Sequence, residues 1–212
     1  RYQGVFERFI KLGASGLGYG VPTNPLLSER LEEVAFARSL DRSRSERFVA
    51  FDVGANKGMY ISMLQRCGAT RSMEIHAFEP DGDLVNHLQR TFAASKDLHI
   101  VPKGVSERSG TATFHKHAHT VLSSFHVAES HPASYRDKTV SVSVDVPLTS
   151  IDEYCAEHGI GFIDHLKIDT EGHDLFVLKG AQRMIKERRI GALQFEFSEM
   201  NLLSRTTFFD HW

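Results

Sequence analysis

Three segments of this 212-residue chain carry residue types that suit a ligand site. The first, FDVGANKGMY (51–60), ends an apolar run, places Gly54 at a turn and opens a helical pattern near Gly58. The second ends in AFEP, where Glu79 stands 25 positions after Gly54. The third, KIDTEGHD (167–174), follows an apolar run and opens the strongest helical pattern in the chain. Because ligands bind at the carboxyl ends of strands in open parallel sheets, the three segments predict one shared site.

The glycine spacing of the first segment disfavours a nicotinamide or flavin oxidoreductase. A dinucleotide site has the pattern G-x-G-x-x-G, and this chain has Asn56 and Met59 where the second and third glycines belong. The Asp52 carboxylate would also repel a pyrophosphate at the helix N-terminus. A P-loop is excluded as well, because the chain has no G-x-x-x-x-G-K-[ST] sequence.

A cationic cofactor without phosphates fits the same residues better. S-adenosylmethionine carries a sulfonium and an ammonium, which a carboxylate at Asp52 would attract. Glu79, at the end of the next predicted strand, can accept hydrogen bonds from both ribose hydroxyls. Taken alone, Gly54 could serve only to form the turn. Together with Glu79, it predicts an S-adenosylmethionine site.

Four motifs in order carry a resemblance to a known family: DVGANKG, AFEP, HLKIDTEGHDLFVLKGA (165–181) and LQFEF (193–197). Over residues 48–198 the chain resembles the FkbM family of methyltransferases. The resemblance implies the class I methyltransferase fold, S-adenosylmethionine as cofactor and O-methylation of a hydroxyl on a sugar or natural product. It implies that the cofactor is bound by Asp52, Gly54, Ala55, Asn56, Gly58, Glu79 and Pro80, with Val105 and Ser106 near the adenine and Asp169 beside the transferred methyl.

Methyl transfer to a hydroxyl requires the acceptor oxygen to lie opposite the sulfonium and to lose its proton. Asp169 and His173 are the candidate bases, although Thr170 or Asp169 could instead cap the following helix. Glu196 could orient the acceptor, or join Asp169 in holding a divalent cation through oxygen ligands. Two carboxylates form an incomplete ligand set, so a divalent cation is possible but no metal is expected.

Elements that could position these residues begin at Phe48, where short apolar runs alternate with helical patterns. The predicted strands are 48–53, 73–78, 99–101, 162–168 and 190–197, and the predicted helices are 58–66, 81–94, 149–158 and 173–188. This alternation predicts an α/β fold of the Rossmann-like, doubly wound type, a mostly parallel sheet with helices on both faces. We predict a helical segment at 1–45 and a methyltransferase domain at 46–212, with an inserted hairpin and long loop at about 110–146.

A histidine-rich stretch in this insertion suggests a second possible chemistry. The pattern H-x-H-x-H could place three imidazoles on one face of a strand, a geometry that binds zinc. No carboxylate or cysteine completes a familiar spacing, so a solvated loop that touches substrate is the favoured interpretation. The histidines concerned are His115, His117, His119, His126 and His131.

Composition narrows the class of protein further. With 25 Lys plus Arg against 27 Asp plus Glu, the net charge of −2 gives no bulk attraction for nucleic acid. No apolar stretch reads as a spanning helix, and two distant cysteines suggest neither a disulfide framework nor a zinc site. We predict a cytoplasmic enzyme that acts on a small-molecule or glycan acceptor.

The end of the chain leaves a second hypothesis open. The family's domain continues through a helix into two last strands, whereas this sequence stops at Trp212. The last strands are therefore expected to be missing, and a non-catalytic nucleoside-binding or interaction module is the alternative to an enzyme.

Overall fold

The computed structural model describes residues 25–117, 125, 140–196, 206 and 210. Contacts divide the chain into two compact units, Arg1–Ala35 and Phe36–Trp212. The second unit contains the sheet and the candidate site. Of the helical segment predicted at 1–45, residues 1–24 lie outside the described residues.

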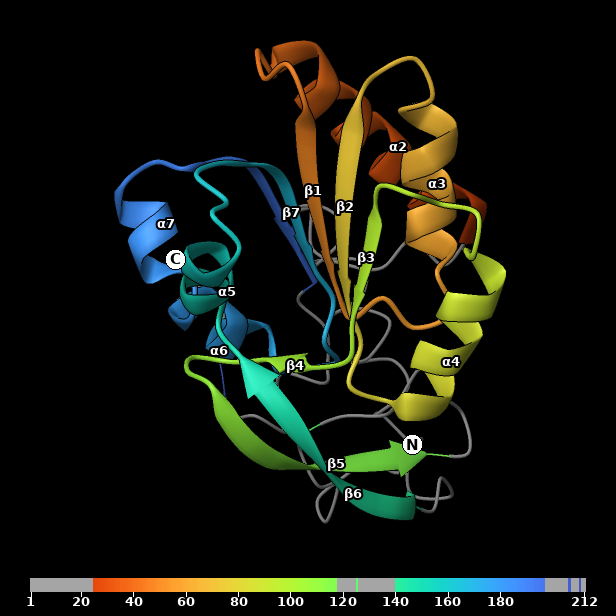
Figure 1. The fold of residues 1–212 in the computed structure, drawn as a ribbon, viewed down its shortest axis with the longest axis vertical. Coiled ribbons are helices and arrows are strands. Elements are labelled where there is room, and N and C mark those ends of the chain that lie inside the picture. The colour runs from red at the N-terminus through yellow and green to blue at the C-terminus, as the bar shows by residue number, and fades with distance from the viewer. Residues whose placement is uncertain (1–24, 118–124, 126–139, 197–205, 207–209, 211–212) are drawn as a thin grey trace, which may run out of the picture. The chain divides into compact units, whose positions relative to one another are not determined.

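A five-stranded, all-parallel sheet forms the centre of the second unit (Figure 1). Its strands are β1 (Phe48–Val53), β2 (Met73–Phe78), β3 (Leu98–Val101), β7 (Ile163–Ile168) and β8 (Ile190–Phe195). Their order is β3-β2-β1-β7-β8. The chain therefore adds strands outward from β1 to β3 on one side, and then returns to add β7 and β8 on the other side of β1. This reversal of direction is where doubly wound folds bind ligands.

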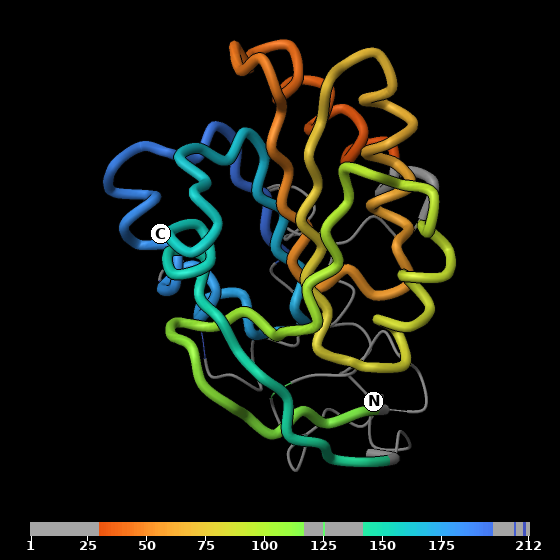
Figure 2. Tube along the Cα trace, in the orientation of Figure 1, coloured from red at the N-terminus to blue at the C-terminus, as the bar shows by residue number. Residues whose placement is uncertain are grey.

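Helices cover both faces of this sheet. The helices are α2 (Pro25–Arg42), α3 (Met59–Cys67), α4 (Gly82–Thr91), α5 (Ile151–Glu157), α6 (Asp174–Lys179) and α7 (Gln182–Lys186). Helices α3 and α4 lie on one face, and α5, α6 and α7 on the other (Figures 1 and 2). Within the described part of the chain, no helix combines the length and the apolar character that a membrane crossing requires.

Alternation along β1 explains the two-sided core. Phe48 and Ala50 belong to the cluster that contains Tyr60 and Leu64 of α3. Phe51, one position on, belongs to the opposite cluster, which also contains residues of α5, α6 and α7. Successive side chains in a strand point to opposite faces, so a strand buried on both sides is apolar at nearly every position.

A second, three-stranded sheet follows the carboxyl end of β3. It contains β4 (Gly104–Val105), β5 (Gly110–His117) and β6 (Val140–Thr149) in the order β4-β6-β5. Strands β5 and β6 pair antiparallel, whereas β4 pairs parallel with β6. The residues of the long loop between β5 and β6 are undescribed except for Phe125.

The single helix predicted over 173–188 is wrong, because the structure has two short helices there, α6 and α7. The carbonyl of Gly180 accepts from Asp152 N at 2.9 Å, so α5 takes a carbonyl that a continuous helix would use. The Asp152 carboxylate then accepts from Arg183 N at 2.7 Å and Met184 N at 3.0 Å. These contacts satisfy amides that would otherwise be unpaired where a new helix starts.

Candidate functional site

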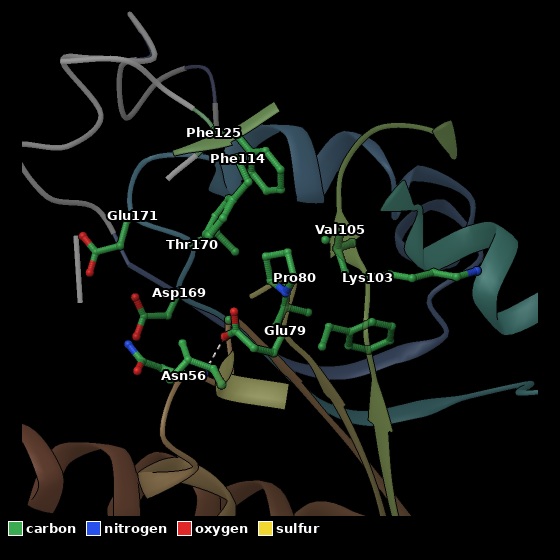
Figure 3. Close-up of a pocket in the computed structure, with 15 residues that line it drawn as sticks. Asn56, Glu79, Pro80, Lys103, Val105, Phe114, Phe125, Asp169, Thr170 and Glu171 are labelled. Atoms are coloured by element: carbon green, nitrogen blue, oxygen red, sulfur yellow. Dashed lines mark hydrogen bonds between the residues drawn. The ribbon is translucent and has the colours of Figure 1, made fainter. Parts of the chain in front are cut away.

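A pocket lies at the carboxyl ends of the central strands, where the three sequence motifs meet. Figure 3 shows Asn56, Asp169 and Glu171 on one part of its wall and Phe114 and Phe125 on another. Of the sequence-predicted residues, Gly54, Asn56, Glu79, Pro80, Val105 and Asp169 line it. Those that do not line it are Asp52, Ala55, Gly58, Ser106, His173 and Glu196.

Gly54 is required at the turn after β1 for two reasons. Its φ of +85° lies in the left-handed region, and a Cβ there would come within 1.9 Å of the Asp169 carbonyl oxygen. The amides of Gly54 and Ala55 both donate to the Phe78 carbonyl at 3.0 Å. The first motif is thereby held against the ends of both β2 and β7.

Glu79 lines the pocket and is held in place by two backbone amides. Its Oε2 accepts from Asn56 N at 2.8 Å, and its Oε1 accepts from Asp81 N at 2.9 Å. A carboxylate has about four lone-pair sites, so each oxygen retains capacity for one further donor. Desolvation raises the pKa of Glu79 to about 7, because the side chain is 4% exposed.

Lys167 joins two of the predicted carboxylates. Its Nζ lies 3.2 Å from Asp52 Oδ1 and 3.1 Å from Asp169 Oδ2. Burial alone would lower the pKa of Lys167, but Asp169 and Asp52 outweigh it and hold that pKa above its ordinary value. Asp52 is fully buried beneath the loop, facing this ammonium, whereas Asp169 is 39% exposed at the pocket.

A series of hydrogen-bonded polar side chains lies next to the Lys167 ammonium, on the α3 side of the sheet. Nζ of Lys167 lies 5.1 Å from the centre of the Tyr60 ring, within cation–π range. The Tyr60 hydroxyl meets His165 Nε2 at 2.8 Å, and His165 Nδ1 meets Ser39 Oγ at 3.0 Å. The Ser39 hydroxyl donates its proton to the Phe36 carbonyl. His165 Nδ1 must therefore donate to Ser39 Oγ, and in the neutral ring Nε2 accepts from the Tyr60 hydroxyl.

Three carboxylates gather beside this ion pair. Ligand oxygens of Asp169, Glu171 and Glu196 lie within 4.8 Å of one another. Desolvation, with repulsion from Asp169 and neighbouring acids, raises the pKa of Glu171 to about 8 and that of Glu196 to about 9. Protonation can relieve this repulsion without an ion.

Neither Thr170 nor Asp169, the expected caps, stands at the N-cap position of α6. His173 stands at the N-cap position and makes no side-chain cap hydrogen bond. Thr170 Oγ1 instead donates to Asp174 Oδ2 at 3.1 Å. Glu171, next to Thr170, lies on the pocket wall with a left-handed φ of +52°.

His173 is not among the residues that line the pocket. Its Nε2 lies 3.0 Å from Ser106 Oγ, and its ring contacts the rings of Phe125 and Phe176 at centroid distances of 4.8 and 4.6 Å. The side chain is buried and absent from the pocket wall. Of the two candidate bases, the geometry therefore favours Asp169.

With this geometry established, comparison with known proteins decides the family. The model of the methyltransferase FkbM domain matches residues 52–212, which is most of the chain. The chain belongs to the FkbM methyltransferase family. This FkbM domain has the Rossmann-like methyltransferase fold, with a mostly parallel sheet between helices.

Two solved structures give weaker likenesses to the FkbM domain. The methyltransferase FkbM from Methylobacillus flagellatus KT is 20% identical with a TM-score of 0.47, over 75% of this chain and 35% of its own. An rRNA methylase from Streptococcus thermophilus is 11% identical with a TM-score of 0.30, over 40% of this chain and 42% of its own. The chain thus spans about a third of the first structure's length. No curated protein matches it.

Sequence reasoning missed several residues of this FkbM site. Lys167 was overlooked, although it stands two positions before Asp169, a spacing that puts both side chains on one face of a strand. Phe114 and Phe125 line the pocket from the hairpin and its loop, and no sequence signal marks either.

The raised pKa values predict that stability falls as pH rises from about 5 to about 9. Glu171 and Glu196 titrate at about 8 and about 9 in the folded FkbM domain against an ordinary 4.5, so the folded state binds more protons across that window. Stability should fall as pH rises, by up to about 1.4 kcal/mol per pH unit per proton. In urea unfolding from about pH 5 to about pH 9, Glu196→Gln should flatten the fall, and the exposed Glu157→Gln should not. An unchanged slope in Glu196→Gln would contradict the pKa assignment.

Proposed function

We propose that this domain transfers a methyl group from S-adenosylmethionine to a hydroxyl of a sugar or natural-product acceptor. The observation that carries the proposal is Glu79, a buried carboxylate fixed by two backbone amides with acceptor capacity to spare. The acceptor class rests on the family resemblance.

The charge of the pocket supports a cationic cofactor without phosphates. Its wall includes three carboxyl groups, those of Glu79, Asp169 and Glu171. Burial raises the pKa of Glu79 to about 7 and that of Glu171 to about 8, so a bound cation would draw both toward the ionised form. Lys103 is the lining lysine among the described residues, and its ammonium points away from the carboxylates (Figure 3). A phosphate would meet repulsion here, whereas a sulfonium or an ammonium would be attracted.

The residues present fit the cofactor. Glu79 would accept hydrogen bonds from the ribose hydroxyls of the cofactor. Because Gly54 has no Cβ, a ligand could approach the backbone of this turn closely. Asn56 also lines the pocket, with its buried Oδ1 free of any hydrogen-bond partner, an acceptor that a bound ammonium would satisfy. The pocket holds about 150 Å³, below a typical ligand pocket of about 300–1,000 Å³, so the cofactor would extend toward its open side. When bound, it would supply an electrophilic methyl group on sulfur.

Asp169 is positioned to take the proton of the acceptor. One of its oxygens, Oδ2, is held by Lys167 at 3.1 Å, while the side chain remains 39% exposed at the pocket. The fixed carboxylate can accept the hydroxyl proton as the new bond forms, a contribution on the order of 10²- to 10⁴-fold. Alignment of the acceptor oxygen would supply more, roughly 7–11 kcal/mol by analogy with intramolecular reactions.

The cofactor assignment is tested by calorimetry with S-adenosylhomocysteine. We expect the wild-type protein to bind it and Glu79→Gln to bind at least about tenfold more weakly, because the amide cannot accept from two hydroxyls as the carboxylate does. The exposed Glu157→Gln serves as the matched control and should bind normally. Absent binding to the folded protein, or equal binding by Glu79→Gln, would refute the assignment.

The catalytic assignment is tested by separating binding from turnover. Asp169→Asn should retain S-adenosylhomocysteine affinity and lose about 10²- to 10⁴-fold in methyl transfer, because the amide cannot take a proton. Turnover is measured with a labelled methyl donor on sugar and natural-product hydroxyls. Equal turnover in the variant would remove Asp169 from the mechanism, and cofactor binding with no turnover on any acceptor would favour the non-catalytic module.

A further inference from the structure

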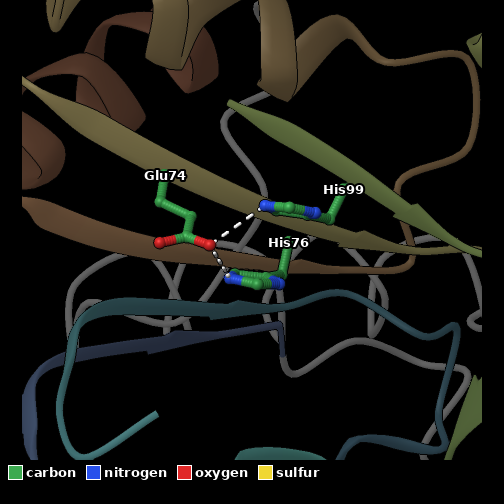
Figure 4. Close-up of side chains that lie close together, drawn as sticks. All are labelled: Glu74, His76 and His99. Carbon is green, nitrogen blue, oxygen red and sulfur yellow. Dashed lines mark ion pairs between the residues drawn. The ribbon is translucent and has the colours of Figure 1, made fainter. Parts of the chain in front are cut away.

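A second cluster of titratable side chains lies in the amino-terminal half of β2, apart from the pocket. Glu74 Oε1 lies 3.0 Å from His99 Nε2 and 3.4 Å from His76 Nε2 (Figure 4). Glu74 is the second residue of β2, whereas Glu79 follows the last, so their backbone positions lie about 16 Å apart along the strand. The cluster is therefore independent of the cofactor site.

Strand register alone brings these three residues together. Glu74 and His76 are two positions apart on β2, so their side chains share one face of the sheet. His99 is the registered partner of His76 on the neighbouring parallel strand β3. The two imidazoles consequently stack, with centroids 4.7 Å apart and planes at 14°.

His76 has an unusual hydrogen-bonding state. Its side chain is 3% exposed, and its buried Nε2 has no hydrogen-bond partner although it points at the Glu74 carboxylate. When neutral, the form in which an imidazole binds a metal, the His76 ring carries a lone pair on one nitrogen. Its Nδ1 lies 2.9 Å from the Tyr154 hydroxyl of α5. If Nδ1 donates there, the Nε2 lone pair faces a carboxylate, an arrangement that a bound cation would stabilise.

We propose that Glu74, His76 and His99 bind a divalent transition metal ion, with Zn²⁺ the best match. Two imidazole nitrogens and one carboxylate oxygen form a known zinc ligand set with an open fourth position. Bonds of about 2.0–2.1 Å at tetrahedral angles separate neighbouring ligand atoms by about 3.3 Å. The observed 3.0 and 3.4 Å from Glu74 Oε1 to the two nitrogens bracket that value. The imidazoles stack almost parallel, so at least one ring would rotate to direct its lone pair at a shared ion.

The surroundings of the cluster suit an accessible metal ion. Arg47 pairs with the other Glu74 oxygen, Oε2, at 3.1 Å, which leaves Oε1 to the histidines. Tyr154 holds the far nitrogen of His76, the usual position of an outer contact that orients a ligating imidazole. All three ligands line a pocket of about 520 Å³, through which an ion and a water ligand can enter. The bound ion would tie β2 and β3 together and stabilise the fold.

The test is titration of the chelator-treated full chain with Zn²⁺ by calorimetry, and with Co²⁺ by visible absorption. We expect one equivalent of Zn²⁺, Co²⁺ bands typical of a tetrahedral site, and a higher unfolding temperature with Zn²⁺. His99→Ala and Glu74→Gln should each weaken binding more than about 100-fold, because each loses a ligand. His99 is half-exposed, so its replacement should leave the fold intact.

Control variants separate this site from other histidines. His87→Ala, on an exposed position of α4, and the double variant His115→Ala/His117→Ala should bind Zn²⁺ as the wild type does. Absent stoichiometric binding to the wild type, undiminished binding to His99→Ala, or loss of binding in the double variant would each overturn the proposal. S-adenosylhomocysteine affinity, measured on the same samples, reports on the other site and should not change.

Discussion

Lys167 places an ammonium 3.2 Å from Asp52 and 3.1 Å from Asp169 at the carboxyl edge of the sheet. Two requirements meet at this position. Asp52 is fully buried on the central strand β1 and needs a compensating charge. Asp169, the base of the proposed reaction, is 39% exposed at the pocket. One lysine on the neighbouring strand β7 serves both carboxylates.

The rest of the site is arranged around that ion pair. The carbonyl of Asp169 abuts the Gly54 turn so closely that a Cβ would collide with it, which couples the loop after β1 to the end of β7. Behind the ammonium, Tyr60, His165 and Ser39 connect α3, β7 and α2 in one buried polar network. Such networks fix a single arrangement when every member is satisfied. The residues at the carboxyl edge of the sheet are therefore fixed by this polar network on the α3 side and by apolar clusters on both faces of the sheet.

The sequence predicted much of this fold because its signals are local. Apolar runs gave β1 and β2 to the residue, and the motifs that follow β1, β2 and β7 meet at one pocket. The division of α6 from α7 was missed because Asp152, thirty residues earlier, supplies the cap. The burial of Asp52 against Lys167 and the stacking of His76 on His99 were missed for a similar reason. Both depend on register between strands, which no single segment encodes.

The most direct test of this account is the coupling between Lys167 and Asp52, measured by urea unfolding of a double-mutant cycle. Lys167→Met should cost about 3–5 kcal/mol, because it leaves a buried carboxylate without its partner. Adding Asp52→Asn to that variant should recover most of the loss, so the two substitutions should be strongly non-additive. Additive losses, with the double variant as unstable as the sum of the single ones, would contradict the central role of this ion pair.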